Sequence, residues 1–146
     1  MPQTKSILLI EDNEYDQFFF TKALREIENA VLYHIANNGQ EALDRLHKSP
    51  VLPDLIFTDI NMPVMDGVEC LTQIVTNEEI KHIPVVILST DTHKLELVRK
   101  LGAKAFIKKT SDYTVLLKRL EHVINLDFTV DISAANQTFQ TALSDL

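Results

Sequence analysis

Acidic, hydroxyl and lysine side chains stand where four apolar runs of this sequence end. Glu11 and Asp12 follow the first run, and Asp59 follows the third, at the start of the stretch DINMPVMDG. Ser89 and Thr90 follow the fourth run, and two lysines follow the fifth. If these side chains meet, the three carboxylates repel one another unless a cation joins them, and all-oxygen ligation suits a hard ion such as Mg²⁺. With that ion bound, Asp59 could attack a phosphoryl group as a carboxylate nucleophile and form an aspartyl phosphate.

The apolar runs have the character of strands that are buried on both faces. They comprise residues 7–10, 31–35, 55–57, 85–88 and 105–107. Their apolar residues are continuous rather than alternating, which suits the strands of a parallel sheet. The second run, VLYHI, is the most mixed, and we expect it at an edge of the sheet.

Helical patterns separate these runs. The apolar positions that share one helical face are Phe20, Ala23, Leu24 and Ile27; Leu43 and Leu46; Val68, Leu71, Ile74 and Val75; Leu95, Val98 and Leu101; and Tyr113, Leu116, Leu117, Leu120, Val123 and Ile124. Asp12 or Asn13 could cap the first helix, and Asp66 the third. Gly102 is expected to end the fourth, and Ser111 to cap the fifth. Five strands that alternate with five helices predict an α/β fold with a parallel sheet covered on both faces.

That architecture predicts where the polar residues lie. In an open parallel sheet the carboxyl ends of all strands share one edge, and ligands bind in the crevice there. The three carboxylates, the Ser89 hydroxyl and one lysine are therefore expected to converge. Only one of Lys108 and Lys109 can reach this site, because adjacent strand residues point to opposite faces.

Composition bounds the class of protein. A chain of 146 residues with 45% hydrophobic residues is long enough for one domain with a real core. Its net charge of −7 argues against nucleic acid or an anionic membrane as the main partner. Cys70 is the single cysteine and cannot form an internal disulfide, and the amino-terminal apolar run is too short for a signal peptide. We therefore expect a soluble, cytoplasmic protein in which Cys70 is a structural thiol.

Residues 5 to about 125 resemble the receiver domain of two-component response regulators. The motifs that carry the resemblance are LLIEDN, DINMPVMDG, PVVILST and GAKAFIKK, in that order and at the ends of the expected strands. The resemblance implies a flavodoxin-like, doubly wound sheet of five parallel strands in the order 2-1-3-4-5, with five helices. It implies a receiver domain over residues 1–125. The carboxyl-terminal extension, 126–146, is not covered by the resemblance and has too few apolar residues for an output domain.

The resemblance also assigns the phosphoacceptor and the metal ligands. Asp59 matches the phosphorylated aspartate, and Glu11 and Asp12 match the acidic pair that holds Mg²⁺. Asn61 matches the position that offers its backbone carbonyl to the metal. Asn61 and Asp91 also match two variable positions that influence how fast the acyl phosphate hydrolyses.

The switch residues follow in the same way. Ser89 matches the switch hydroxyl, Lys109 the phosphate-pairing lysine, and Phe106 the aromatic residue that changes rotamer. Thr110 departs from the family, which usually has proline after this lysine, often with a cis peptide bond. Because a cis bond before a non-proline residue costs about 2.5 to 4 kcal/mol, we expect a trans bond here.

The implied function is a phosphorylation-controlled switch that is not an enzyme beyond its own phosphorylation and dephosphorylation. A sensor histidine kinase would phosphorylate Asp59, and the new charge would reshape the surface of the fourth helix, fifth strand and fifth helix for a downstream protein. Alternatives are a relay intermediate that passes the phosphoryl group to a histidine phosphotransfer protein, and a phosphorylation-independent binding module. A flavin binder fits poorly, because the acidic loop EDNEYD would repel a flavin phosphate. A phosphohydrolase would normally need an acid where this chain has Asn61.

Two further segments carry expectations. Phe18, Phe19 and Phe20 cannot all face one side of a helix, so at least one ring is expected near the surface. The tail from Leu126 to Leu146 lacks lysine and arginine but has many apolar residues. It could pack on the domain, pack on a second copy or stay disordered. A homodimer through this tail, or through the fourth helix, fifth strand and fifth helix, is open.

Overall fold

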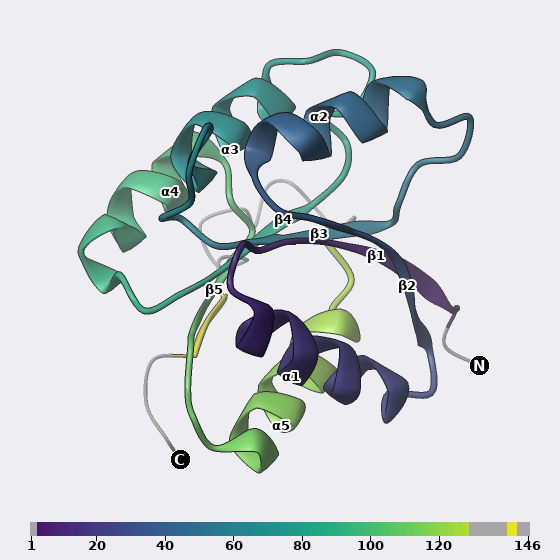
Figure 1. Cartoon of the computed structure of the whole chain (residues 1–146), viewed down its shortest axis with the longest axis vertical. Coiled ribbons are helices and arrows are strands. Elements are labelled where there is room, and N and C mark those ends of the chain that lie inside the picture. Colours follow the sequence, from purple (N-terminus) through teal and green to yellow (C-terminus); the bar gives the residue numbers. More distant parts are fainter. Residues whose placement is uncertain (1–2, 129–139, 143–146) are drawn as a thin grey trace.

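Parallel strands form the middle layer of the structure, with helices on both faces (Figure 1). It is a computed structural model that describes residues 3–128 and 140–142. The strands are β1 (Lys5–Ile10), β2 (Ala30–Ala36), β3 (Leu55–Thr58), β4 (Val85–Ser89), β5 (Ala105–Lys108) and β6 (Gln140–Ala142). They lie in the order β2-β1-β3-β4-β5-β6. The predicted parallel order 2-1-3-4-5 is confirmed, and β2 lies at an edge as expected.

The helices divide between the two faces of the sheet, with α1 and α5 on one and α2, α3 and α4 on the other (Figure 1). They are α1 (Glu14–Arg25), α2 (Gly39–Lys48), α3 (Gly67–Val75), α4 (Leu95–Leu101) and α5 (Tyr113–Ile124), with a short 3₁₀ turn at Thr92–Lys94. Within the described residues no helix has the length and apolar composition needed to cross a membrane.

Side-chain caps set where these helices begin. Asn13 caps α1 and Asp66 caps α3, each accepting a backbone N–H from the first turn. The predicted cap of α5 was wrong by one residue. Asp112, not Ser111, has the extended backbone that this position requires, and its carboxylate accepts the N–H of Val115 at 3.2 Å.

Two apolar clusters, one on each face of the sheet, form the core. On the α1 and α5 face, the Phe20 and Phe57 rings meet edge to face with centroids 5.1 Å apart. Phe18 and Phe19 on the same helix are 58% and 41% exposed, which confirms that the three phenylalanines divide between core and surface. The other cluster contains Phe106 and Cys70, both fully buried.

The burial of Cys70 predicts a thiol that does not react in the folded protein. Burial raises its pKa to about 12, so very little thiolate is present near pH 8. We expect iodoacetamide at that pH to leave the native protein unmodified for hours. In about 6 M guanidinium chloride, which unfolds the protein, intact mass should show the addition of one carbamidomethyl group. Rapid labelling of the native protein would contradict this burial.

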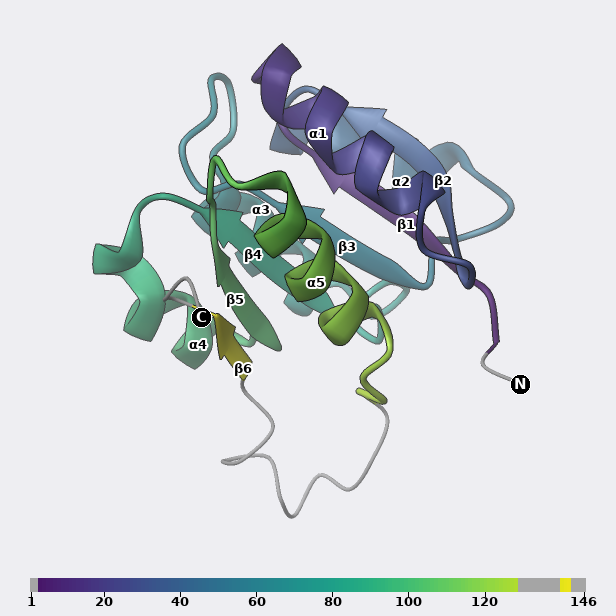
Figure 2. The ribbon, with the colours of Figure 1, turned by 90° about the horizontal axis from the view of Figure 1, so that it is seen from below.

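Residues 140–142 of the tail lie beside β5, where β6 extends the sheet (Figure 2). The pairing is parallel and sets Ala105 against Gln140 and Ile107 against Ala142. Of the three arrangements open for the tail, packing on the domain therefore holds for residues 140–142. Residues 129–139 and 143–146 lie outside the described residues.

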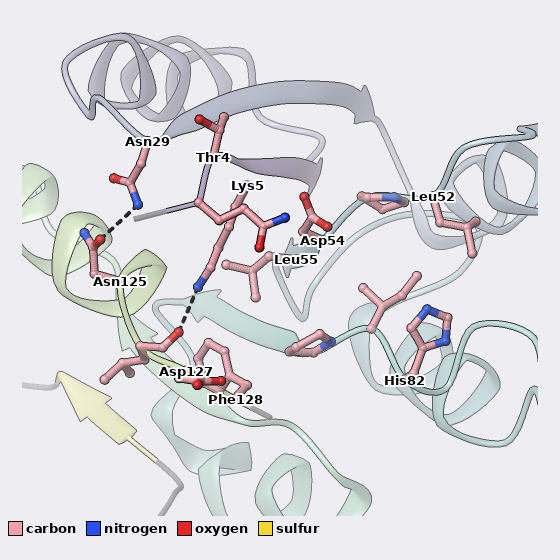
Figure 3. Close-up of a pocket in the computed structure, with 15 residues that line it drawn as sticks. Thr4, Lys5, Asn29, Leu52, Asp54, Leu55, His82, Asn125, Asp127 and Phe128 are labelled. Carbon is pink, nitrogen blue, oxygen red and sulfur yellow. Dashed lines mark hydrogen bonds between the residues drawn. The ribbon is translucent and has the colours of Figure 1, made fainter. Parts of the chain in front are cut away.

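A hollow of about 660 Å³ lies at the amino edge of the sheet, where β1 begins and α5 ends (Figure 3). The ammonium of Lys5 is already engaged there, donating to the backbone carbonyls of Ile124 and Leu126. The side chains of Asn29 and Asn125 are hydrogen-bonded at 2.9 Å. These bonds tie the end of α5 to the starts of β1 and β2. The hollow lies at the edge opposite the ends of the strands that carry Glu11, Asp12 and Asp59.

Candidate functional site

The carboxyl edge of the sheet brings three acidic residues together. Glu11 and Asp12 follow β1, and Asp59 follows the neighbouring strand β3. One carboxylate oxygen from each lies within 4.8 Å of the others. Glu11 is 1% exposed and Asp59 is 9% exposed, whereas Asp12 is exposed to solvent. Negative charge is thus concentrated at a site that is open on one side.

Backbone contacts hold Asp59 in a defined place. Its N–H donates to the carbonyl of Ile10 at 3.1 Å, which continues the pairing of β3 with β1. Its Oδ1 accepts the N–H of Ile60 at 2.7 Å, and Oδ2 accepts from Lys109 at 2.9 Å. Gly67, the first residue of α3, lies so close that an ideal Cβ would be 2.0 Å from the carbonyl oxygen of Asp59. The loop therefore needs glycine at this position.

Lys109 supplies positive charge to this cluster, while Lys108 is exposed. The Lys109 ammonium lies 2.7 Å from Glu11, 2.7 Å from Asp16 and 2.9 Å from Asp59. The bond between Lys109 and Thr110 is trans, as expected from the missing proline. Thr110 therefore does not keep the lysine from the acids.

The charges shift the acid–base behaviour of two groups. Burial raises the pKa of Glu11 to about 6, although the hydrogen bond from Lys109 opposes the rise. Burial alone would lower the pKa of Lys109, but hydrogen bonds to Asp16, Glu11 and Asp59 outweigh it and raise that pKa above its ordinary value. The lysine therefore carries a positive charge within the site at neutral pH.

The ion pair between Asp16 and Lys109 was not predicted from the sequence. Asp16 lies in the first turn of α1, where acidic residues commonly favour the helix dipole, so its type gave no separate signal. Its position five residues after Glu11 on a helix beside the carboxyl edge could have indicated its approach to the cluster.

The remaining candidate residues lie on β4, β5 and the loops that follow β3 and β4. Ser89 is 1% exposed, and its hydroxyl accepts the N–H of Asp91 at 3.1 Å. Its carbonyl accepts the N–H of Lys109 at 3.0 Å, which joins the ends of β4 and β5. Asn61 is exposed, with its amide 3.5 Å from the Asp91 carboxylate, and Phe106 is fully buried.

The donor set fits a divalent metal ion. Within the described residues, Glu11, Asp12 and Asp59 form the one group of three or more acidic, histidine or cysteine side chains whose ligand atoms come this close. Carboxylate oxygens are the donors that hard cations such as Mg²⁺ and Mn²⁺ prefer. The exposed Asp12 leaves one side open to ligands from solvent.

A family model for the response regulator receiver domain matches residues 7–121. The chain belongs to this family. The resemblance stated from the motifs is therefore confirmed, and phosphorylation-based signalling in a two-component system is the activity of the class. The acidic cluster, Lys109 and Ser89 all lie within the matched part of this receiver.

Curated relatives share this receiver in proteins of very different length. The polar-differentiation response regulator DivK of Brucella ovis is 34% identical over 110 residues, which cover 73% of this chain and 85% of DivK. The hybrid signal transduction histidine kinase M of Dictyostelium discoideum is 36% identical over 124 residues. That match covers 81% of this chain but 5% of the kinase, so the receiver spans a small part of its length.

Two solved structures share the fold of the receiver. The phosphorylated cyanobacterial phytochrome response regulator RcpA has a TM-score of 0.75 and 29% identity, covering 82% of this chain and 91% of RcpA. The Mn(2+)-bound form of response regulator Rcp1 has a TM-score of 0.73 and 27% identity, covering 88% of this chain and 96% of Rcp1.

Proposed function

We propose that this receiver is a phosphorylation-controlled switch in which Asp59 accepts a phosphoryl group from a sensor histidine kinase. The observation that carries the proposal is the environment of Asp59. Its carboxylate is held between the Ile60 N–H and the Lys109 ammonium, beside two further acids that fit a metal ion. The solved structures of phosphorylated RcpA and Mn(2+)-bound Rcp1 support both parts of it.

In the proposed step, a carboxylate oxygen of Asp59 attacks the phosphorus of a phosphohistidine. An O–P bond forms as the P–N bond breaks, and the electron pair passes to the imidazole nitrogen, which takes up a proton. Lys109 pairs with the phosphoryl oxygens, and the Ser89 hydroxyl donates to one of them. Both contacts stabilise the added negative charge.

Magnesium is the proposed cofactor. Glu11, Asp12 and Asp59 would hold the ion, together with the backbone carbonyl of Asn61. When bound, the ion offsets the negative charge that the carboxylates and the phosphoryl group bring together.

The proposed output is binding of a protein, without turnover of an external substrate. Movement of Ser89 toward the phosphoryl group would let Phe106 repack in the core and change the surface of α4, β5 and α5. The partner at that surface is a downstream protein, a phosphotransfer protein or a second copy of the receiver. Phe106 lies on β5 opposite Ile87, two residues before Ser89 on the neighbouring strand β4, which supports this coupling.

The test is the intact mass of the protein after incubation with Mg²⁺ and acetyl phosphate. We expect one labile phosphoryl adduct on the wild type, none on Asp59→Asn, and an unchanged adduct on Asp44→Asn, which alters an exposed carboxylate of α2. EDTA is expected to prevent the reaction. An unlabelled wild type beside a labelled known receiver, or an adduct that persists in Asp59→Asn, would overturn the proposal.

A further inference from the structure

The contact between Asp16 and Lys109 joins α1 to the candidate phosphorylation site. Asp16 Oδ2 lies 2.7 Å from Lys109 Nζ, although 93 positions separate the two residues in the chain. The Lys109 side chain is 14% exposed and that of Asp16 is 39% exposed. The ion pair is therefore partly shielded from water and is not an ordinary surface pair.

The hydrogen bonds of the ammonium explain why this contact matters. A lysine ammonium has three N–H donors and no acceptor. In the structure these donors face three carboxylates, from Glu11, Asp16 and Asp59. The donor that faces Asp59 can pass to a phosphoryl oxygen on that residue, whereas a second hydrogen bond from Lys109 to the phosphoryl group requires Glu11 or Asp16 to lose its donor.

Asp16 differs from the other two partners of the lysine. Glu11 and Asp59 belong to the group of acids that fits a metal ion, and Asp16 does not. Among the described residues, Lys109 is the cation that pairs with Asp16. Only the Lys109 ammonium lies between the Asp16 carboxylate and Asp59. The negative charge of Asp16 therefore repels an anionic phosphodonor that approaches Asp59.

We propose that Asp16 is a positioning residue that holds Lys109 in the resting site and competes with the incoming phosphoryl group for it. This inference rests on the proposed function of Asp59. Asp16 then slows phosphorylation and favours the unphosphorylated state. Its removal frees one donor of Lys109 and removes one negative charge beside the acceptor.

The effect can be separated from that of the helix dipole. Glu14 lies in the same first turn of α1, and its side chain is exposed. An acid at either position favours the amino end of the helix by a similar amount. Glu14→Gln is thus a matched control. It removes one negative charge from the same helical turn but does not alter a partner of Lys109.

The experiment measures the rate of adduct formation with Mg²⁺ and several concentrations of acetyl phosphate. We expect Asp16→Asn to raise the rate at least about threefold, because one repulsive charge is lost beside the acceptor. Glu14→Gln should give a rate within a factor of about 1.5 of the wild-type rate, because water screens the exposed Glu14 carboxylate more strongly. Asp16→Glu, which keeps the charge, should restore a rate near that of the wild type.

A second measurement reads the contact without phosphorylation. In metal-free protein, we expect Asp16→Asn to shift the ¹⁵N and ¹H signals of the Lys109 ammonium, and Glu14→Gln to leave them in place. Folding of each variant is checked by its amide spectrum. In a Lys109→Met background, Asp16→Asn should raise the rate less than it does in the wild type, because that background has no lysine donor to free.

The outcomes separate this inference from the proposed function. No adduct on the wild type would refute the phosphoacceptor role of Asp59 itself. A labelled wild type with an unchanged or slower Asp16→Asn would overturn the role of Asp16 alone, as would equal effects of Asp16→Asn and Glu14→Gln. A faster Asp16→Asn that Asp16→Glu reverses would support it.

Discussion

Replacing Lys109 with methionine is expected to lower the free energy of unfolding of the metal-free protein by about 2 to 4 kcal/mol near neutral pH. The substitution keeps much of the side-chain volume but removes the cation between three carboxylates. Glu11 and Asp59 are left with side chains 2% and 11% exposed, so water replaces the lost partner poorly. Protonation of Glu11, whose pKa is already raised to about 6, limits the loss.

Urea unfolding in EDTA, followed by circular dichroism, measures this loss. Lys108→Met is the matched control, since the neighbouring lysine is exposed, and it should change stability by less than about 0.5 kcal/mol. Added Mg²⁺ should stabilise Lys109→Met more than the wild type, because the ion replaces the missing positive charge. Equal stability of the two lysine variants in EDTA would contradict the electrostatic role of Lys109.

Replacing Gly67 with alanine is expected to destabilise the protein by about 3 kcal/mol or more and to impair phosphorylation. The added Cβ would lie 2.0 Å from the carbonyl oxygen of Asp59 and 2.8 Å from the Cα of Ile60. Both are backbone atoms, so no rotamer change can relieve the clash. The strand end that carries Asp59 must move away from α3, which displaces the carboxylate from Lys109.

Gly102→Ala is the control for this prediction. Gly102 ends α4 with a φ of 115°, a conformation that alanine adopts at a cost of about 1 to 2 kcal/mol. It lies away from Asp59, and its new Cβ would meet the Val75 side chain at 3.2 Å. We expect it to lower the melting temperature but keep the phosphoryl adduct. Full phosphorylation of Gly67→Ala, or an equal loss in both variants, would show that this close approach does not position Asp59.

The strands and the polar residues at their ends could be predicted from the sequence because both are local features. Continuous apolar runs indicate strands buried on both faces, and alternation with helices requires parallel pairing. Parallel pairing in turn places the segments that follow Ile10 and Thr58 at the same edge of the sheet. The meeting of Glu11, Asp12 and Asp59 follows from these rules without any knowledge of side-chain packing.

The contacts of α1 depended on the tertiary structure. Asp16 reaches Lys109 only because α1 packs across the sheet at one particular angle and rotation. The amphipathic pattern indicates which face of the helix is buried, but not which residue at its rim lies over the strand ends. For the same reason, a capping pattern could not separate Ser111 from Asp112 at the start of α5.

The sequence by itself determined the family, the parallel sheet of strands one to five and the acids that gather at its edge. The tertiary structure decided that Lys109 lies among three carboxylates, that Asp16 is one of them, and that residues 140–142 add a strand beside β5. The physical reason is the range of the interactions. Hydrophobic periodicity and turn chemistry act between near neighbours, whereas ion pairs and edge pairing join segments whose approach is set by the packing of the whole domain.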